Sequence, residues 1–425
     1  MPTTLFRRST LAKFAIPVAA LVGCGGKGGV TTTSASATTS APTASASVSA
    51  APPPRTIDDT PKGKGFTEVV PASKAGCKPE YLELATYLLR GELTIAGRAG
   101  KDPKIPAEFA AAWLVQLPDG AQIGFGGYDG QARKIAKVRG IGKAHDNAPH
   151  LFATGDRWTV AWFDDRGLAY AYPEFESSSN PAIQHFGAPT LDPAKVAFAL
   201  DPAGVLVVAS PFGTSDNQLS VFVFGASPKG VGLTKAAVSP VVPAVAADKT
   251  GYSLVWLEAA GQIMAQRFNL EGAEVGPATI LVDKGGTQRT NLQMVSVEGG
   301  SLLTWVEGDK VLARRLDDRA NVAGDVIVVG TGKHPAVEPT GKGAVVAMLS
   351  TVEGAADQLV LVRTDGLTSP ASAILASDGK QPVLDPPALA VAPTAVALTY
   401  TVVMSTTISS KRAWLATLNR ACLKE

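Results

Sequence analysis

The residues best suited to chemistry lie in one short polar run and in the polar turn that follows it. His145, Asp146 and His150 belong to the run His-Asp-Asn-Ala-Pro-His, and Asp164 and Asp165 lie in the next turn. Imidazole and carboxylate groups bind polar ligands or metals and transfer protons. The loop that carries the run would open on the same face as this turn, so these five residues are predicted as a polar ligand-binding site. A metal site is the alternative, but because the spacing matches no established metal motif, no metal is predicted.

Acidic residues recur in the polar turns of several repeats, including the turn with Asp164 and Asp165. Such carboxylates could bind a cation or act as acid and base, but an Asp in a hairpin turn ordinarily satisfies the turn itself, and this second reading is favoured. The sequence contains no G-x-S-x-G elbow, phosphate loop or HExxH, so no catalytic residue and no cofactor is predicted. The turn residues are Asp119, Asp164, Asp165, Glu258, Glu307 and Asp309.

The elements that must position these side chains are hairpins of an internal repeat. Gly251–Trp256 (GYSLVW), Gly300–Trp305 (GSLLTW) and Arg157–Trp162 (RWTVAW) each precede a polar turn and a second alternating run, which is typical of a β-hairpin. A period of about 48 residues suits a four-stranded blade, so we predict an all-β, seven-bladed β-propeller, with six or eight blades as alternatives. The anchor positions are 113, 162, 210, 256, 305, 348 and 400.

This pattern resembles the strand-Trp-turn-strand β-propeller repeats of bacterial surface lipoproteins, over about residues 80–423. It lacks the W-D ending of WD40 repeats, the Asp-box of sialidases and the Y-W-T-D motif, so the resemblance implies a fold and carries over no catalytic residues. An anchor Trp could be a ligand platform, but its repeated strand position favours packing between blades. The anchor tryptophans are Trp113, Trp162, Trp256 and Trp305.

The last repeat supplies only three strands, 388–392, 395–403 and 412–419, and residues 82–98 are expected to add the missing outer strand. Residues around Tyr81 to Leu89 also fit helical spacing, so a helix there is an alternative. Closure of the ring in this way would bring Cys77 beside Cys422. In an oxidising compartment a disulfide is expected, and two free thiols are the alternative.

The N-terminus is predicted to be an export signal. Basic residues precede an apolar run that is too short to span a membrane. Leu21-Val22-Gly23-Cys24 resembles the bacterial lipobox, which implies cleavage before Cys24 and lipidation of that residue. An ordinary export signal is the alternative. Residue 25 is Gly and not the Asp that retains some lipoproteins at the inner membrane, so the outer membrane is favoured.

Three regions are expected: a signal peptide at 1–23, a disordered tether at 24–66 and a propeller domain at 67–425. Residues 31–54 consist largely of Ser, Thr, Ala and Pro with a single Val, too little apolar surface to offset the entropy of ordering. Outside the first 25 residues no 18-residue apolar stretch occurs, so no further membrane span is predicted.

Charge and composition narrow the function. With 39 Lys and Arg against 37 Asp and Glu, the chain lacks the basic excess of a nucleic-acid binder. The leading hypothesis is a lipid-anchored module of the cell envelope that binds or scaffolds an envelope protein or polysaccharide. The membrane is a partner through the lipid. The alternative is an envelope hydrolase or lyase with its site in the central funnel, so whether the chain is an enzyme stays open, with a binding protein favoured.

Overall fold

The computed structural model describes residues within the range 58–423, all of which belong to the unit Thr56–Glu425. The predicted signal peptide, Cys24 and the tether as far as residue 57 lie outside the described residues. The internal segments that are also not described are 87, 99–106, 118–119, 146–147, 155–156, 176, 178–179, 187–190, 192, 212–217, 225–228, 236–241, 259, 284–287, 352–356, 378–380 and 404–410.

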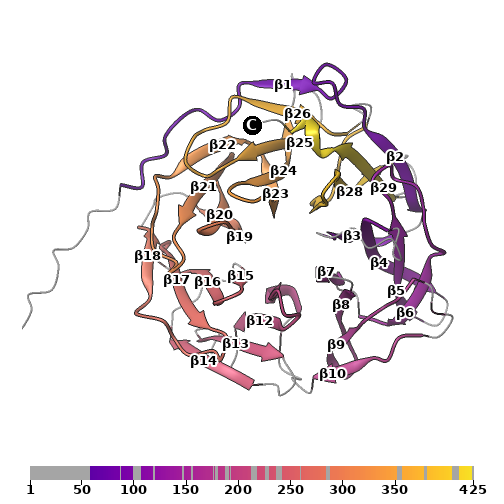
Figure 1. Ribbon diagram of the computed structural model, residues 1–425, viewed down its shortest axis with the longest axis horizontal. Helices are drawn as coiled ribbons and strands as arrows, with labels where there is room; N and C mark the ends of the chain where they lie inside the picture. Colours follow the sequence, from indigo (N-terminus) through magenta and orange to yellow (C-terminus); the bar gives the residue numbers. More distant parts are fainter. Residues whose placement is uncertain are drawn as a thin grey trace, which may run out of the picture. The chain divides into compact units, whose positions relative to one another are not determined.

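The described strands form seven sheets arranged as blades around a common axis (Figure 1). Within each blade successive strands are antiparallel, and one blade gains a fifth strand in parallel orientation. The chain is therefore a seven-bladed β-propeller, as predicted, and the alternatives of six and eight blades are wrong. No helix among the described residues is long and apolar enough to cross a membrane.

We number the blades along the chain. Blade 1 contains β3 (Leu88–Gly97), β4 (Phe109–Leu117), β5 (Gly120–Tyr128) and β6 (Arg139–Lys143), and blade 2 contains β7 (His150–Thr154), β8 (Arg157–Asp164), β9 (Gly167–Ala171) and β10 (Gln184–Phe186). Blade 3 contains β11 (Ala197–Leu200), β12 (Leu206–Pro211), β13 (Gln218–Phe224) and β14 (Lys229–Lys235), and blade 4 contains β15 (Ala244–Asp248), β16 (Gly251–Leu257), β17 (Ile263–Asn269) and β18 (Thr279–Val282). Blade 5 contains β19 (Arg289–Val297), β20 (Gly300–Glu307), β21 (Lys310–Leu316) and β22 (Ile327–Thr331). Blade 6 contains β23 (Lys333–Pro339), β24 (Ala344–Thr351), β25 (Asp357–Thr364), β26 (Ser372–Leu375) and β1 (Glu68–Pro71). Blade 7 contains β27 (Ala388–Val391), β28 (Ala395–Val403), β29 (Lys411–Asn419) and β2 (Glu80–Thr86).

The anchor tryptophans lie on the second strands of their blades and are buried. Trp113, Trp162, Trp256 and Trp305 are each at most 2% exposed. Neighbouring blades cover both faces of these strands, which explains their continuous apolar runs. In blade 2 the Trp162 Nε1–H also donates to the Lys143 carbonyl of blade 1, at 2.9 Å. These side chains therefore pack between sheets and are not exposed ligand platforms.

The glycine that opens each of the two clearest repeats has a structural cause. Gly251 and Gly300 begin the second strands of blades 4 and 5 with φ of 153° and 145°. A Cβ at either position would lie 2.0 Å from a carbonyl oxygen, of Phe268 or Leu316 respectively. Only glycine can adopt this backbone conformation while the third strand approaches so closely. The glycine at the start of these repeats is therefore required by packing.

The N-terminal part of the domain closes the ring in blade 7. Strand β2 pairs antiparallel with β29, with Glu80 opposite Thr417, and supplies the outer strand that the last repeat lacks. The helix considered for this stretch is wrong, because the backbone of β2 hydrogen-bonds to β29 instead. The stretch 82–98 contains parts of two strands: β2, which ends at Thr86 and is the closing strand of blade 7, and β3, which starts at Leu88 and is the inner strand of blade 1.

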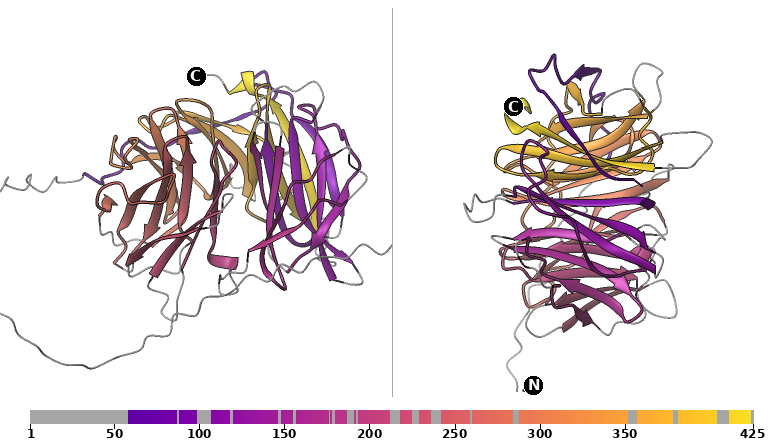
Figure 2. Two further views of the ribbon diagram at one scale, coloured as in Figure 1. Left: turned by 60° about the horizontal axis from the view of Figure 1, so that its bottom comes forward. Right: turned by 90° about the vertical axis from the view of Figure 1, so that its right-hand side faces the viewer.

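Residues 58–77, which we call the strap, run along the outer edges of three blades before β2 begins (Figures 1 and 2). The Asp59 carboxylate (Oδ1) accepts a hydrogen bond from Nη1 of the buried Arg314 of blade 5, at 2.6 Å. Lys62 forms a bridge with Ile327 of β22, and β1 then pairs in parallel with β26. The strap thus joins blades 5 and 6 before it reaches blade 7.

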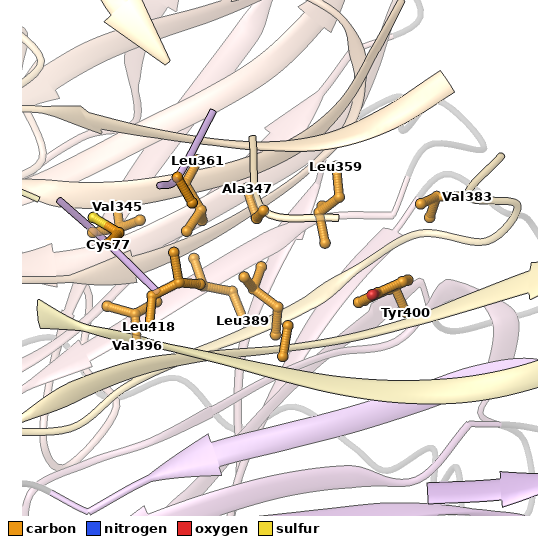
Figure 3. Close-up of a cluster of buried hydrophobic side chains, with 14 of the residues drawn as sticks. Cys77, Val345, Ala347, Leu359, Leu361, Val383, Leu389, Val396, Tyr400 and Leu418 are labelled. Atoms are coloured by element: carbon orange, nitrogen blue, oxygen red, sulfur yellow. The ribbon is translucent and has the colours of Figure 1, made fainter. Parts of the chain in front are cut away.

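The strap ends in the core between blades 6 and 7. Figure 3 shows Cys77 among apolar side chains of both blades, including Leu361 of β25 and Leu418 of β29. Cys77 is buried and forms the predicted disulfide with Cys422, with a Cα–Cα distance of 5.5 Å. The bond ties the end of the strap to the end of the last blade.

Candidate functional site

Two of the predicted site residues meet at the rim of blade 2. The His145 backbone N–H donates to the Phe163 carbonyl at 2.9 Å, which places the loop between blades 1 and 2 beside the β8–β9 turn. His145 Nε2 then lies 3.3 Å from Asp165 Oδ1. Both side chains are more than half exposed, so water competes strongly with this ion pair.

Asp164, in contrast, is tied into the blade. Its Oδ2 lies 2.7 Å from Nε2 of His185 on the outermost strand β10, and its Oδ1 accepts from the Arg166 backbone N–H at 2.9 Å. Both partners of the Asp164–His185 contact are less than one fifth exposed. This carboxylate closes its own turn and holds an edge strand, as acidic turn residues commonly do. His185 was missed from the sequence because it is an isolated histidine on a short strand.

His150 lies apart from the rim, at the start of the inner strand β7. No hydrogen bond or ion pair to Asp164 or Asp165 is found for it within the described part of the chain, and its ring centroid lies 4.1 Å from that of Phe198 on β11. Burial lowers the pKa of His150 to about 4, so its imidazole is neutral at pH 7. Asp146, the fifth predicted residue, lies outside the described residues.

The inner strands enclose a cavity of about 440 Å³. Strands β3, β7, β19 and β23 lie innermost in Figure 1, and residues of these four strands and of β27 form most of the wall. A second cavity of about 550 Å³ shares His150, Phe198, Asn291 and Gln293 with the first. We call the two together the central channel. Its polar lining includes His150, Asn291, Gln293, His334 and Glu338.

Two lining residues are placed by β-bulges at the start of inner strands. The pairing of β19 with β20 shifts between Thr290 and Gln293, and that of β23 with β24 shifts between Lys333 and Ala336. In each bulge two residues oppose one, and the first of the two is Asn291 or His334, each with φ of 52°. A bulge re-aims a side chain without breaking the sheet, and here the result is two polar groups lining the channel.

Glu338 is the chemically most unusual group in the channel. It lies on β23 and lines the same cavity as Pro386, Pro387 and Leu389. Among the described residues, no hydrogen bond or ion pair to its carboxyl group is found. Burial without a compensating charge raises its pKa to about 8, so the group is mostly protonated at pH 7.

The channel lining is therefore electrically neutral near pH 7. The pKa of His334 is also lowered, mainly by burial and further by the neighbouring Lys333. Lys333 itself pairs with Asp357 at 2.6 Å. The described lining of the first cavity contains no Lys, Arg or Asp, and no group of three metal-binding side chains occurs among the described residues. The arrangement offers hydrogen bonds and aromatic surface without net charge.

Comparison with known proteins gives structural similarity alone. No protein-family model matches the chain, and no curated protein does. The polysaccharide lyase Uly1 aligns over 79% of this chain and 99% of its own, with 8% identity and a TM-score of 0.42. A lectin from Aleuria aurantia aligns over 67% and 98%, with 10% identity and a TM-score of 0.40. The arabinofuranosidase PaAbf62A from Podospora anserina aligns over 77% and 90%, with 9% identity and a TM-score of 0.34. At these values the similarities carry no information about ligand or reaction.

Proposed function

We propose that the chain is a lipid-anchored binding module of the cell envelope that takes its ligand in the central channel. The observation that carries this proposal is the cavity of about 440 Å³, which falls within the usual size of ligand pockets. Its wall includes residues with amide, imidazole and carboxyl groups and the aromatic residues Phe152 and Phe198. Such a mixture of apolar surface and few polar groups is typical of small-ligand sites.

The ligand that fits this wall is uncharged and rich in hydroxyl groups, such as a segment of a neutral polysaccharide. A buried charge on a ligand needs an opposite charge, and the neutral forms of His150 and Glu338 supply none at pH 7. Hydroxyl groups both donate and accept hydrogen bonds, as do the amides of Asn291 and Gln293. If the chain instead bound an envelope protein or acted as a scaffold, it would use its outer surface, and the channel would stay unoccupied.

The direct test is binding to arrayed neutral oligosaccharides, with sulfated and uronic-acid counterparts beside them. We expect neutral members to bind and the charged counterparts to bind more weakly. His150→Ala is expected to weaken binding by about tenfold, because it removes a hydrogen-bonding ring from the wall. The control His145→Ala changes a histidine at the rim and should leave affinity unchanged. If His145→Ala abolished binding and His150→Ala did not, the ligand site would lie at the rim.

A second candidate function is an envelope hydrolase or lyase that works in the same channel. Glu338 favours it, because a carboxyl group protonated at neutral pH can act as a general acid. Glycoside hydrolysis ordinarily needs a second carboxylate, and Glu338 is the one acidic residue among the described residues that line the cavity. Mass spectrometry of an oligosaccharide incubated with the protein separates the two functions: cleavage that Glu338→Gln abolishes would establish the enzyme.

The membrane anchor is tested by Cys24→Ala. We expect this variant to leave the membrane fraction, because all of the proposed acyl chains would be attached to Cys24. Several acyl chains on one residue give stable anchoring, and the substitution would remove all of them. Immunoblots of fractionated cells measure the change, and Gly25→Ala serves as the matched control that should stay with the membrane. Retention of Cys24→Ala in the membrane fraction would show that the lipid does not hold the protein. Separation of inner and outer membranes tests the proposed outer-membrane location.

A further inference from the structure

Four described residues other than glycine have a left-handed backbone conformation, and they fall into two pairs. Ala132 and Ala320 occupy equivalent turns, in which their backbone N–H groups donate to the carbonyls of Asp129 and Asp317. Gly272 stands at the same position of blade 4, with its N–H donating to the Asn269 carbonyl. The tight turn therefore explains the backbone of this first pair.

The second pair, Asn291 and His334, has no such turn. Both are the first residue of a bulge on an inner strand, in the neighbouring blades 5 and 6. In bulges whose first residue is left-handed, that residue is usually glycine, because a Cβ raises the energy of this conformation. Two adjacent blades thus carry a polar side chain where glycine would be less strained. We call these two residues the bulge pair.

Within the described part of the protein, side-chain hydrogen bonds do not compensate this strain. No hydrogen bond from the side chain of Asn291 or His334 to another described residue is found. Both residues instead line the first cavity, together with the aromatic residues Phe152 and Phe198. A strained, unpaired polar residue that persists at a cavity wall is characteristic of a functional position.

We propose that the bulge pair binds the hydroxyl groups of a neutral saccharide in the central channel, an inference that rests on the proposed function. The Asn291 amide offers two donors and an acceptor, and the neutral His334 ring offers one donor and one acceptor. Adjacent hydroxyl groups of a sugar ring present the complementary set. The apolar face of the ring then lies against the aromatic side of the cavity.

Replacement of both residues by glycine separates binding from folding. In the full chain, Asn291→Gly and His334→Gly, alone and combined, should leave Tm unchanged or higher, because glycine adopts φ of 52° without strain. The double variant should bind the best-bound arrayed oligosaccharide at least about tenfold more weakly. Ala320→Gly is the matched control: it relieves the same backbone conformation away from the channel and should leave affinity unchanged.

Each other result overturns the inference in a distinguishable way. A lower Tm for Asn291→Gly or His334→Gly would show that the bulge pair supports the fold and is not kept for a ligand. Unchanged affinity of the double variant, with His150→Ala still weakening binding, would overturn the role of the bulge pair and leave the channel as the site. If no arrayed saccharide binds the wild-type chain, the proposed function fails and the inference fails with it.

Discussion

Glu338→Gln is expected to stabilise the protein increasingly as the pH rises from about 5 to about 8. The folded state holds the pKa of Glu338 at about 8, whereas the ordinary value for glutamate is 4.5. Between these values the unfolded chain releases a proton that the folded chain keeps, so the contribution of Glu338 to stability is complete below pH 4.5 and is lost by pH 8. Glutamine has no proton to lose, so the variant escapes this loss.

The expected difference is at most about 5 kcal/mol above pH 8, since one pKa unit corresponds to about 1.4 kcal/mol. Part of the Glu338 side chain is accessible from the cavity, which reduces the effect to about 3 kcal/mol. Urea denaturation of both chains at about pH 5, 7 and 9 measures it. Glu271→Gln, in an exposed turn of blade 4, is the control that should follow the wild-type curve.

His150 contributes with the opposite sign and must be separated from Glu338. Its pKa falls from 6.5 to about 4 on burial, so its contribution is complete above pH 6.5 and is lost as the pH drops through 4. In Glu338→Gln this loss at low pH should persist, while the loss between about pH 5 and 8 disappears. Parallel curves for the variant and the wild-type chain would mean that water reaches the Glu338 carboxyl group and that its pKa is not raised.

The blade architecture was predictable because the same weak hairpin pattern recurs seven times at a nearly constant spacing. A single hairpin such as Arg157–Trp162 is ambiguous, but all seven anchor positions fall on second strands of blades. The physical cause is that each second strand is covered on both faces and must be apolar, as Val255 and Trp256 in blade 4 illustrate. The closing strand was also predictable, since the last repeat lacks one.

The strap and the channel were not predictable, because both depend on contacts between residues far apart in the sequence. Glu68–Pro71 is too short and too ordinary to reveal that it pairs with β26, roughly 300 residues later. Glu338 and His334 line the channel because of the direction of β23 and its bulge. Neither feature can be read from the periodicity of the sequence. The loop with His145 was expected on the same face as the turn with Asp165, and these two side chains do lie together at the rim. Nothing in the sequence indicated that His150 lines the channel.

Cys422→Ser, in a Cys24→Ser background that leaves no third thiol, is expected to lower the free energy of unfolding by up to about 5–6 kcal/mol. The Cys77–Cys422 bond closes a loop with a sequence separation of 345, and a longer loop removes more freedom from the unfolded chain. The folded state should change little, because β2 stays paired with β29, and Asp59 stays paired with Arg314. Guanidinium denaturation without reductant measures the loss.

Reductant supplies the matched control. Dithiothreitol should lower the stability of the Cys24→Ser chain to that of the chain that also carries Cys422→Ser, and should leave the latter unchanged. Hydrogen exchange of the β2 and β29 amides shows where the effect acts. If the bond works through the unfolded chain, these amides exchange faster only in proportion to the lost global stability. Faster exchange of the β2 amides alone would mean that the disulfide instead prevents local opening of the ring at blade 7. The contacts of the strap with blades 5 and 6 would then be too weak to keep β2 in place.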